Sequence, residues 1–366
     1  MTKIVISAIN FRDGGPLSIL QDLIGYLSNE MKDRYEIVLL VHSESLVPLD
    51  QRRFFDIIEF PDSVNSYSKR LYYEYYYFRK LSLKLKPHLW LSLHDMSPNV
   101  VSDIRVVYCH NPSPFYDVGL KEFFLDFRFF LFCKLYHFIY RINLKKNDYV
   151  IVQQEWLRGR FCKSYGLESD VVVVAYPEVE SPTTAVKNNS DDCFSFFYPS
   201  FPRVFKNFEI VCEAVEIIEV ENDFHDFKVL LTIDGTENFY SKSIFKKYSH
   251  LECINFIGRI SRQDVFKIYE TSHCLLFPSK LETWGLPITE AKRHGLPIIA
   301  SDLPYAHETV GNYTKVDFFL PNNARDLANK MLRAIHSAEF PGNKAILPSK
   351  PFASGWSSLL KVILEE

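Results

Sequence analysis

The sequence has little net charge and no long apolar run. Its 42 Lys and Arg residues against 45 Asp and Glu residues give a formal net charge of -3 at pH 7. A general nucleic-acid-binding protein shows a strong basic excess, so we expect no nucleic-acid partner. The most apolar stretch, Phe123 to Tyr140, is interrupted by Asp126, Arg128 and Lys134. No run reaches about 18 uncharged apolar residues, so the sequence predicts no membrane-spanning helix.

Paired cysteines and metal-binding motifs are also lacking. The seven cysteines are odd in number and scattered, with no Cys-x-x-Cys pair and no zinc-like spacing of Cys and His. This usage is typical of free thiols in a reducing cytoplasm. The stretch from Met1 to Ile9 has a strand pattern instead of a basic segment with a long apolar core. We therefore expect no signal peptide and a cytoplasmic protein.

The chain instead contains two series of short apolar runs that alternate with helical patterns. A length of 366 residues is long for one hydrophobic core and usual for two. The expected strands are 4–9, 36–41, 89–93, 105–108 and 148–153 in the first half, the last of them closing the first sheet, and 194–198, 228–233, 254–257, 273–277 and 297–300 in the second. Alternating strands and helices predict an α/β fold with two Rossmann-like domains. We interpret 171–175 as the crossing between them and place the boundary near 178–192, where Pro, Ser, Thr and Asn dominate.

The most informative stretch runs from Phe277 to Pro304, with the sequence FPSKLETWGLPITEAKRHGLPIIASDLP. Pro287 suits the first position of a helix and Gly295 suits the position after its end, so a short helix over 287–294 is expected. The free amides near Gly285 and Leu286 would attract an anion such as a diphosphate, and Gly285 leaves room for it.

Two carboxylates lie on either side of this expected anion site. Glu282 and Glu290 would repel a phosphate, but each can accept hydrogen bonds from sugar hydroxyl groups. A nucleotide-sugar offers both an anion and hydroxyl donors. The alternative interpretation is a surface loop followed by an amphipathic helix that has a glutamate near its start.

The segment Glu282-Thr-Trp-Gly-Leu-Pro-Ile-Thr-Glu290, followed by Ala291, Gly295, Pro297 and Ser301-Asp302-Leu303-Pro304, resembles the E-x7-E donor signature of glycosyltransferase family 4. These are retaining enzymes of the GT-B fold, in which two Rossmann-like domains face each other across a cleft. The resemblance implies that Glu290 binds the ribose, Glu282 the transferred sugar, and the amides of Gly285 and Leu286 the diphosphate. Thr283 and Trp284 complete the implied donor-binding segment.

A lysine after the first strand of the second half completes the implied donor site. Lys206, in a Lys-Asn pair, matches the lysine of the family and would neutralise the diphosphate. The family arginine five or six residues before it is missing, and Ser200 and Phe201 stand there instead. Arg203 is a substitute donor-binding candidate at a different spacing. No Asp-x-Asp follows a strand, so we expect no metal and no cofactor, with Lys206 and the helix amides stabilising the leaving group.

The first half offers weaker candidates. Gly14 and Gly15 form a turn between the first strand and its helix, where the backbone could approach the donor phosphates or the acceptor; an ordinary tight turn is the alternative. His94 and His110 each follow a strand, where open α/β sheets present functional groups. The resemblance implies that His110, with Asn111, faces the transferred sugar as a catalytic residue. A structural histidine is the alternative for each.

Two segments combine aromatic and cationic residues, Tyr67 to Lys86 and Phe115 to Lys146. Contact with an anionic membrane, packing as core helices whose tyrosines keep a wet edge, and stacking on nucleic-acid bases are the alternatives for the first segment. The second is a further candidate for a membrane or lipid-acceptor face.

Together these features predict a metal-independent, retaining glycosyltransferase of the hexosyltransferase type. Its domains would be 1–178 for the acceptor, 179–350 for the nucleotide-sugar, and 351–366 as a helix packing back on the first domain. The expected partners are a nucleotide-diphosphate-sugar and a lipid-linked oligosaccharide of bacterial surface-polysaccharide assembly, such as O-antigen or capsule, with the enzyme cytoplasmic or peripheral on the plasma membrane. Another GT-B activity, such as an epimerase or a phosphorylase, and an inactive scaffold subunit are the alternatives.

Overall fold

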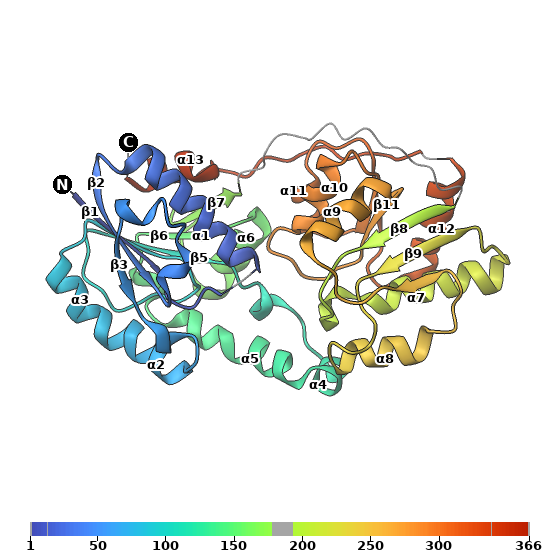
Figure 1. Ribbon diagram of the computed structural model, residues 1–366, viewed down its shortest axis with the longest axis horizontal. Helices are drawn as coiled ribbons and strands as arrows, with labels where there is room; N and C mark the ends of the chain where they lie inside the picture. Colours follow the sequence, from blue (N-terminus) through green and yellow to red (C-terminus); the bar gives the residue numbers. More distant parts are fainter. Residues whose placement is uncertain (1, 13, 178–192, 338, 365–366) are drawn as a thin grey trace. The chain divides into compact units, whose positions relative to one another are not determined.

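The computed structural model describes residues 2–12, 14–177, 193–337 and 339–364 (Figure 1). The expected domain boundary at 178–192 therefore lies outside the described residues. The chain forms two compact units. The first contains Met1–Phe115, Lys134–Glu178 and Pro348–Glu366, and the second contains Tyr116–Cys133 and Val179–Leu347. The short segment Tyr116–Cys133 thus joins the second unit, which nothing in the sequence indicates.

The described part of the first unit is built on an eight-stranded sheet in which every neighbouring pair runs parallel. In spatial order the strands are β14 (Phe352–Ser354), β7 (Val172–Tyr176), β6 (Tyr149–Val152), β5 (Ile104–Cys109), β4 (Leu89–Ser92), β1 (Thr2–Ala8), β2 (Tyr35–Val41) and β3 (Asp56–Glu59).

Two predictions about this sheet are wrong. The run at 171–175 is not a crossing between domains, and 148–153 does not hold the last strand of the first sheet. β7 pairs with β6 along Val172 to Val174, and β14 adds a further strand beyond it. The three consecutive valines are the apolar run of a strand buried on both faces. β3 was missed because its four residues are all partly or fully exposed and show no apolar run.

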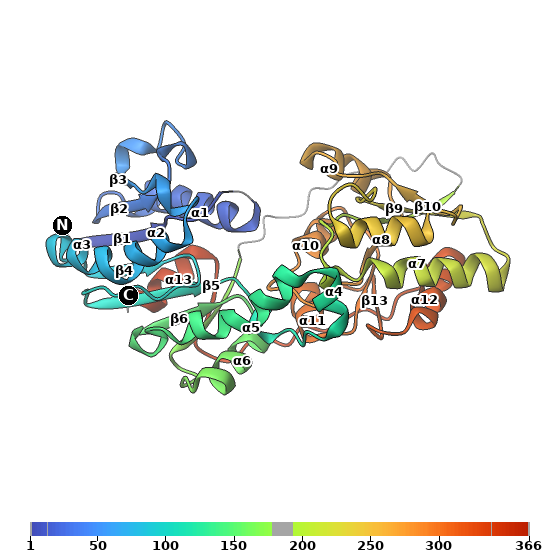
Figure 2. The ribbon, with the colours of Figure 1, turned by 90° about the horizontal axis from the view of Figure 1, so that it is seen from below.

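Helices cover both faces of the first sheet. On one face, α1 (Gly14–Tyr26) and α13 (Gly355–Leu364) share a core in which Leu23 and Leu360 pack with Ile6. On the other face lie α3 (Phe78–Leu85), α5 (Phe127–Arg141) and α6 (Glu155–Tyr165). The aromatic and cationic segment from Tyr67 to Lys86 is helical up to Leu85, as α2 (Tyr67–Tyr72), a π-helical turn and α3. Figure 2 shows α2, α3 and α5 from the face that they cover.

A buried arginine fixes the chain where it returns to the first unit. Arg158 of α6 is 2% exposed. Its guanidinium donates hydrogen bonds to the carbonyl oxygens of Ser349 and Pro351 at 2.9 and 2.8 Å. These bonds hold the segment immediately before β14, so the edge strand is placed by a residue almost two hundred positions earlier in the chain.

The described part of the second unit is built on a six-stranded parallel sheet. Its spatial order is β10 (Ile254–Phe256), β9 (Phe227–Leu231), β8 (Phe194–Tyr198), β11 (Cys274–Phe277), β12 (Ile298–Ser301) and β13 (Val316–Phe319). The helices are α4 (Leu120–Leu125), the start of α5, α7 (Phe208–Glu216), α8 (Phe239–Tyr248), α9 (Arg262–Thr271), α10 (Leu286–Arg293), α11 (Pro304–Val310) and α12 (Ala324–His336). The expected α/β architecture with two parallel sheets is confirmed.

Two features of this fold matter for function. β8 and β11 are neighbours in the second sheet, so the loops that leave their carboxyl ends lie side by side. These loops carry Lys206 and Glu282. Among the described residues, no helix is long and apolar enough to cross a membrane.

Candidate active site

The loops after β8 and β11 are joined by hydrogen bonds between their backbones. The amide of Lys280 donates to the carbonyl oxygen of Phe205 at 2.7 Å. Asn207 is buried, has φ +57° and donates from its side chain to the carbonyl oxygen of Pro321 at 3.0 Å. Residues 199–207, which carry Lys206, are called the lysine loop. Asparagine is among the few residues with a side chain that adopt this left-handed conformation readily, and Asn207 ends the lysine loop where α7 begins. The two loops therefore form one supported surface.

Lys206 and Glu282 form an ion pair on this surface. The Nζ of Lys206 lies 2.5 Å from Oε1 of Glu282, and the two side chains are 17% and 14% exposed. The same ammonium lies 5.9 Å from the ring centroid of Phe277. Lys206 is thus not a solvated residue that merely caps α7. It is a mostly buried cation held at the carboxyl edge of the sheet.

The start of α10 lies beside the same aromatic ring. Gly285 has φ +84°, and a Cβ there would lie 3.2 Å from the ring of Phe277. Both the backbone conformation and the space therefore favour glycine. The helix begins at Leu286, one residue before the prediction, and Gly295 follows it with φ +65°. Leu286 is 41% exposed, so the N-terminal turn of α10 reaches the surface.

The loop between Glu282 and α10 is supported from its buried side. Trp284 is 6% exposed, and its Nε1 donates to the hydroxyl of Thr289 at 3.0 Å. The hydroxyl of Thr309 donates to the carbonyl oxygen of Trp284, and that of Tyr305 donates to the carbonyl oxygen of Ser279 at 2.6 Å. The side chain of Trp284 therefore holds the loop in place. Its neighbour Thr283 is partly exposed.

Glu290 lies deeper than Glu282. It is 9% exposed, and its Oε2 accepts a hydrogen bond from the hydroxyl of Tyr269 at 3.2 Å. Oε1 accepts a hydrogen bond from the guanidinium of Arg262 at 3.1 Å. Burial, with the nearby Glu290 carboxylate, holds the pKa of Tyr269 well above its usual range, so the hydroxyl stays a donor. Arg262 is largely exposed and can be replaced by another donor at little cost.

Arg203 has a different environment from Lys206. Its side chain is half exposed and lies 3.5 Å from Asp126, in the short segment Tyr116–Cys133. From the same segment, the ring of Phe129 packs against Phe205 with centroids 5.2 Å apart. Arg203 therefore fastens this segment to the lysine loop.

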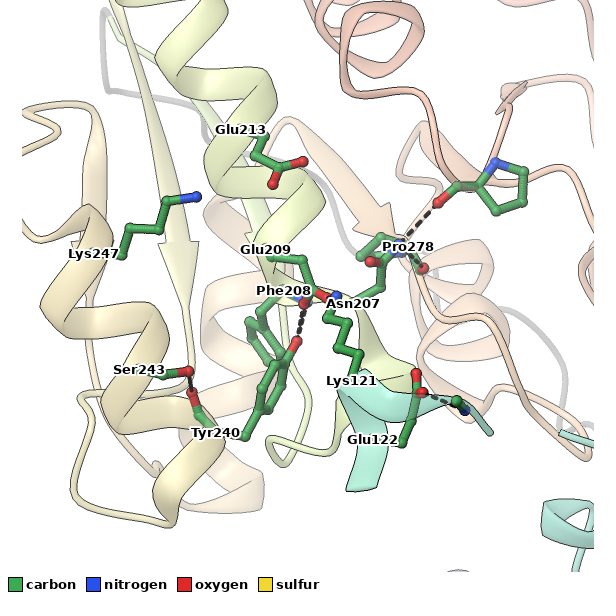
Figure 3. A network of polar contacts seen from close by, with 12 residues as sticks. Lys121, Glu122, Asn207, Phe208, Glu209, Glu213, Tyr240, Ser243, Lys247 and Pro278 are labelled. Atoms are coloured by element: carbon green, nitrogen blue, oxygen red, sulfur yellow. Dashed lines mark hydrogen bonds and ion pairs between the residues drawn. The ribbon is translucent and has the colours of Figure 1, made fainter. Parts of the chain in front are cut away.

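A second polar network fixes the same segment (Figure 3). Lys121 of α4 forms an ion pair with Glu209 of α7, and the Tyr240 hydroxyl of α8 donates to the same carboxylate. The amide of Phe208 donates to the Tyr240 oxygen at 2.9 Å. Burial lowers the pKa of the nearby Lys280, while Glu209 opposes this shift. The network thus ties α4 to α7 and α8 at the point where the lysine loop ends.

In the first unit, His110 is held by an aspartate. Asp95 Oδ1 accepts the backbone amides of His110 and Asn111 at 2.6 and 2.9 Å and the hydroxyl of Tyr140 at 2.8 Å. The ring of His110 stacks on Tyr108 with centroids 4.2 Å apart. Burial lowers the pKa of His110, which favours the neutral imidazole.

Two polar atoms of the His110 turn lack a partner among the described residues. They are Nε2 of His110 and Nδ2 of Asn111. His94 differs, because it is 1% exposed and its Nε2 lies 3.0 Å from the Ser7 hydroxyl and 3.2 Å from a Glu74 oxygen. Buried polar atoms are usually satisfied, so the His110 turn is the better candidate to bind a ligand.

The predicted site residues therefore divide between the two units. Lys206, Glu282 and Gly285 lie together around Phe277, whereas His110 belongs to the first unit. Gly14 has φ +69° at the start of α1, and a Cβ at either Gly14 or Gly15 would meet no atom within 4 Å. The left-handed backbone of the turn therefore explains why glycine is favoured at position 14, and no close contact requires it. The supporting residues were missed, above all Asp95 and Tyr269. They are far from their partners in sequence, and no local pattern indicates them.

Comparison with known proteins finds a family model that matches part of the chain, and distant relatives. Residues 182–344 match the model of the family Glycosyl transferases group 1. The O-antigen chain mannosyltransferase RfbU of Salmonella typhimurium is 22% identical over 268 residues, which is 70% of each chain.

Solved structures agree in fold. The lipopolysaccharide outer core galactosyltransferase WaaB superposes with a TM-score of 0.63 at 14% identity, over 92% of this chain and 90% of WaaB. Anabaena HepE in complex with UDP-glucose gives a TM-score of 0.61 at 14% identity, over 92% of this chain and 90% of HepE. At such identities the likeness shows the fold alone, which is the GT-B fold.

Proposed function

We propose that this glycosyltransferase, whose group 1 domain spans residues 182–344, moves a hexose from a nucleoside-diphosphate donor to a lipid-linked oligosaccharide with retention of configuration. The observation that carries the proposal is the Lys206–Glu282 pair next to Gly285 at the carboxyl edge of the second sheet. The pair places a cation that can bind a diphosphate beside a carboxylate that can accept hydrogen bonds from sugar hydroxyl groups. Both side chains lie on loops that are hydrogen-bonded to each other.

Each donor part then has a partner of matching chemistry. The diphosphate lies at the N-terminal turn of α10, near Gly285 and Leu286, where helix amides and the helix dipole favour an anion. Glu282 accepts hydrogen bonds from the transferred sugar. Glu290 accepts them from the ribose, and Tyr269 keeps its second oxygen oriented.

Bond cleavage leaves extra negative charge on the departing diphosphate. Lys206 is a cation on a mostly buried side chain, held in place by Glu282, so it stabilises this charge more than it stabilises the bound donor. We propose that Lys206 and the helix amides do this without a metal, because no Asp-x-Asp follows a strand. In the described chain, Glu219, His225 and Cys253 are close enough to share an ion. They lie beside or before the amino ends of β9 and β10, whereas Lys206 and Glu282 follow the carboxyl ends of their strands.

The acceptor assignment rests on the relatives and on the first unit. RfbU is named for O-antigen synthesis and WaaB for the lipopolysaccharide outer core. We assign acceptor binding to the first unit, and we keep His110 of that unit, whose Nε2 and the side-chain Nδ2 of Asn111 lack partners among the described residues, as the catalytic residue that faces the transferred sugar. A lipid-linked acceptor would make this protein work peripherally at the cytoplasmic face of the membrane.

A panel of nucleoside-diphosphate sugars, with a short lipid-linked oligosaccharide as acceptor, tests the proposal. We expect release of nucleoside diphosphate from one donor, resistance of turnover to EDTA, and a product with the anomeric configuration of the donor by NMR. An epimerase would instead return a changed nucleotide-sugar with the diphosphate still attached. A scaffold would bind a donor without turnover, and either result would contradict the proposed reaction.

A further inference from the structure

Helices α4 and α5 present an apolar stripe to solvent. Within α5 the exposed side chains recur every three or four residues, which is the spacing of one face of a helix, and α4 adds two exposed side chains just before it. They are Leu120, Phe124, Phe127, Leu131, Leu135, Phe138 and, just beyond α5, Ile142. Their exposed fractions run from 38% to 78%. We call this set the outer stripe.

The outer stripe is not a misplaced core face. α5 has a second apolar face on its opposite side, made by Phe129, Cys133, Tyr136 and Tyr140, all at most 8% exposed. This inner face already packs into the protein. The ring of Phe123 contacts the rings of Phe124, Phe127 and Phe130 at 5.1 to 5.3 Å, so the aromatic surface continues from α4 onto α5. Figure 2 shows α4 leading into α5.

Cations lie on both sides of the outer stripe. On a helix of 3.6 residues per turn, Arg128 falls on one flank and Lys134 and Arg141 on the other. All three are exposed. An apolar strip with cations on both flanks matches a bilayer surface that has anionic headgroups above acyl chains. A second copy of this chain would bring the same cations into mutual repulsion.

We propose that the outer stripe of α4 and α5 docks on an anionic lipid bilayer. The helices lie in the plane of the interface, with Phe124, Phe127 and Phe138 among the acyl chains and the flanking cations at the phosphates. The segment from Tyr67 to Lys86 contributes less to membrane binding, because its exposed apolar side chains are mainly tyrosines and Lys69 is already paired with Asp62.

The side of α4 and α5 opposite the outer stripe contacts the lysine loop. Within the second unit, Asp126 contacts Arg203 and Phe129 contacts Phe205, the neighbour of Lys206. A helix with its side chains is about 10 to 12 Å thick. A bilayer held on the outer stripe therefore lies roughly one helix diameter from the lysine loop, which suits an acceptor anchored in that bilayer. This last step rests on the proposed function, whereas the docking itself does not.

Vesicle flotation of the full chain tests the docking without any turnover. The probes are vesicles of phosphatidylcholine alone and with phosphatidylglycerol added, at low and high salt. The first variant carries Phe124→Ser, Phe127→Ser and Phe138→Ser. The second carries Arg128→Glu, Lys134→Glu and Arg141→Glu. The matched control carries Phe239→Ser, Ile346→Ser and Leu347→Ser, which remove equally exposed apolar side chains elsewhere.

We expect the wild type and the matched control to float with the anionic vesicles at low salt, and much less at high salt. Each lost cation should lower binding about fivefold, so the second variant falls by about a hundredfold. The first variant should lose binding at all salt concentrations. Equal flotation of all proteins, or loss only on replacing Tyr72, Tyr76 and Leu83, would overturn the proposal. A concentration-dependent dimer that disappears in the first variant would also overturn it, because the occupant would then be a second copy.

Flotation and donor turnover fail independently. A protein that floats as expected but releases no nucleoside diphosphate contradicts the proposed function alone. A protein that turns over a donor but does not float contradicts the docking alone.

Discussion

The ammonium of Lys206 and the carboxylate of Glu282 lie 2.5 Å apart, although the two residues are 76 positions apart in the chain. A diphosphate bound at the start of α10 would compete with Glu282 for this ammonium, which would free the carboxylate for a sugar hydroxyl. The two side chains thus act as a unit, and their effects should not add.

We expect Glu282→Ala to lower kcat/KM for the donor by about ten- to a hundred-and-fifty-fold, since a hydrogen bond to a charged group contributes about 1.5 to 3 kcal/mol. The same substitution in a Lys206→Ala background should have a clearly smaller effect. Steady-state kinetics of the four proteins measure this cycle. Strictly additive losses would mean that the two residues do not share one ligand.

Glu290 should affect both the fold and donor use. Glu290→Ala leaves the buried hydroxyl of Tyr269 without its acceptor, which costs about 1 to 3 kcal/mol of unfolding free energy. Glu290→Gln keeps an acceptor oxygen, so it should keep the melting temperature while still raising KM for the donor. Thermal melts and kinetics of both variants, with Tyr269→Phe as the control, distinguish the two effects. A Glu290→Gln protein with an unchanged KM would remove Glu290 from donor binding.

Asp95 should act through His110 as a positioning residue. Asp95→Ala removes the acceptor for the amides of His110 and Asn111, so we expect kcat to fall by about tenfold or more. Asp95→Asn keeps an oxygen at that position and should restore most of the rate, whereas Tyr136→Phe removes only a 3.4 Å contact and should change little. Equal losses of kcat in the two Asp95 variants, with equal melting temperatures, would contradict this role.

Glu74 gives the first unit a pH-dependent stability. Burial raises its pKa to about 8, whereas the unfolded chain has a value of 4.5. The folded state therefore holds about one more proton than the unfolded state at pH 6.5 and about half a proton more at pH 8, so raising the pH over this range lowers the free energy of unfolding by roughly 1.5 kcal/mol. Burial holds the pKa of the adjacent His94 well below 6.5, so this histidine is neutral throughout that range.

A glutamine at position 74 cannot titrate. The free energy of unfolding of Glu74→Gln should therefore not fall in this way as the pH rises. Urea unfolding of both proteins at several pH values between 6.5 and 8 provides the comparison. Parallel curves for the wild type and the variant would show that Glu74 does not carry the effect.

The sequence predicted the repeating parts of the fold well. β8 at Phe194–Tyr198 has the predicted bounds, because a buried parallel strand leaves a clear apolar run. β3 and β14 were missed because both are short edge strands with few buried residues. The position of Tyr116–Cys133 depends on contacts with Phe205 and Glu209, which no local pattern encodes.

The part of the candidate site that lies in a single continuous segment could be identified from the sequence. The segment from Glu282 to Glu290 shows its carboxylates, its glycine and its helix start within nine residues. The residues that orient those groups were not predictable, because Tyr269 and Thr309 reach the site through tertiary packing. The motif implied that Trp284 belongs to the donor-binding segment, but it does not indicate that the Trp284 side chain supports the loop from the buried side.

The kcat for nucleoside-diphosphate release by Lys206→Ala, measured beside the wild type and Arg203→Ala, tests the proposed role of Lys206 most directly. A cation that stabilises the departing diphosphate acts mainly in the transition state. We therefore predict that Lys206→Ala lowers kcat by about tenfold or more in addition to raising KM, at an unchanged melting temperature. Arg203→Ala, which removes a half-exposed contact with Asp126, should change kcat little. A Lys206→Ala protein that keeps the kcat of the wild type would contradict the account.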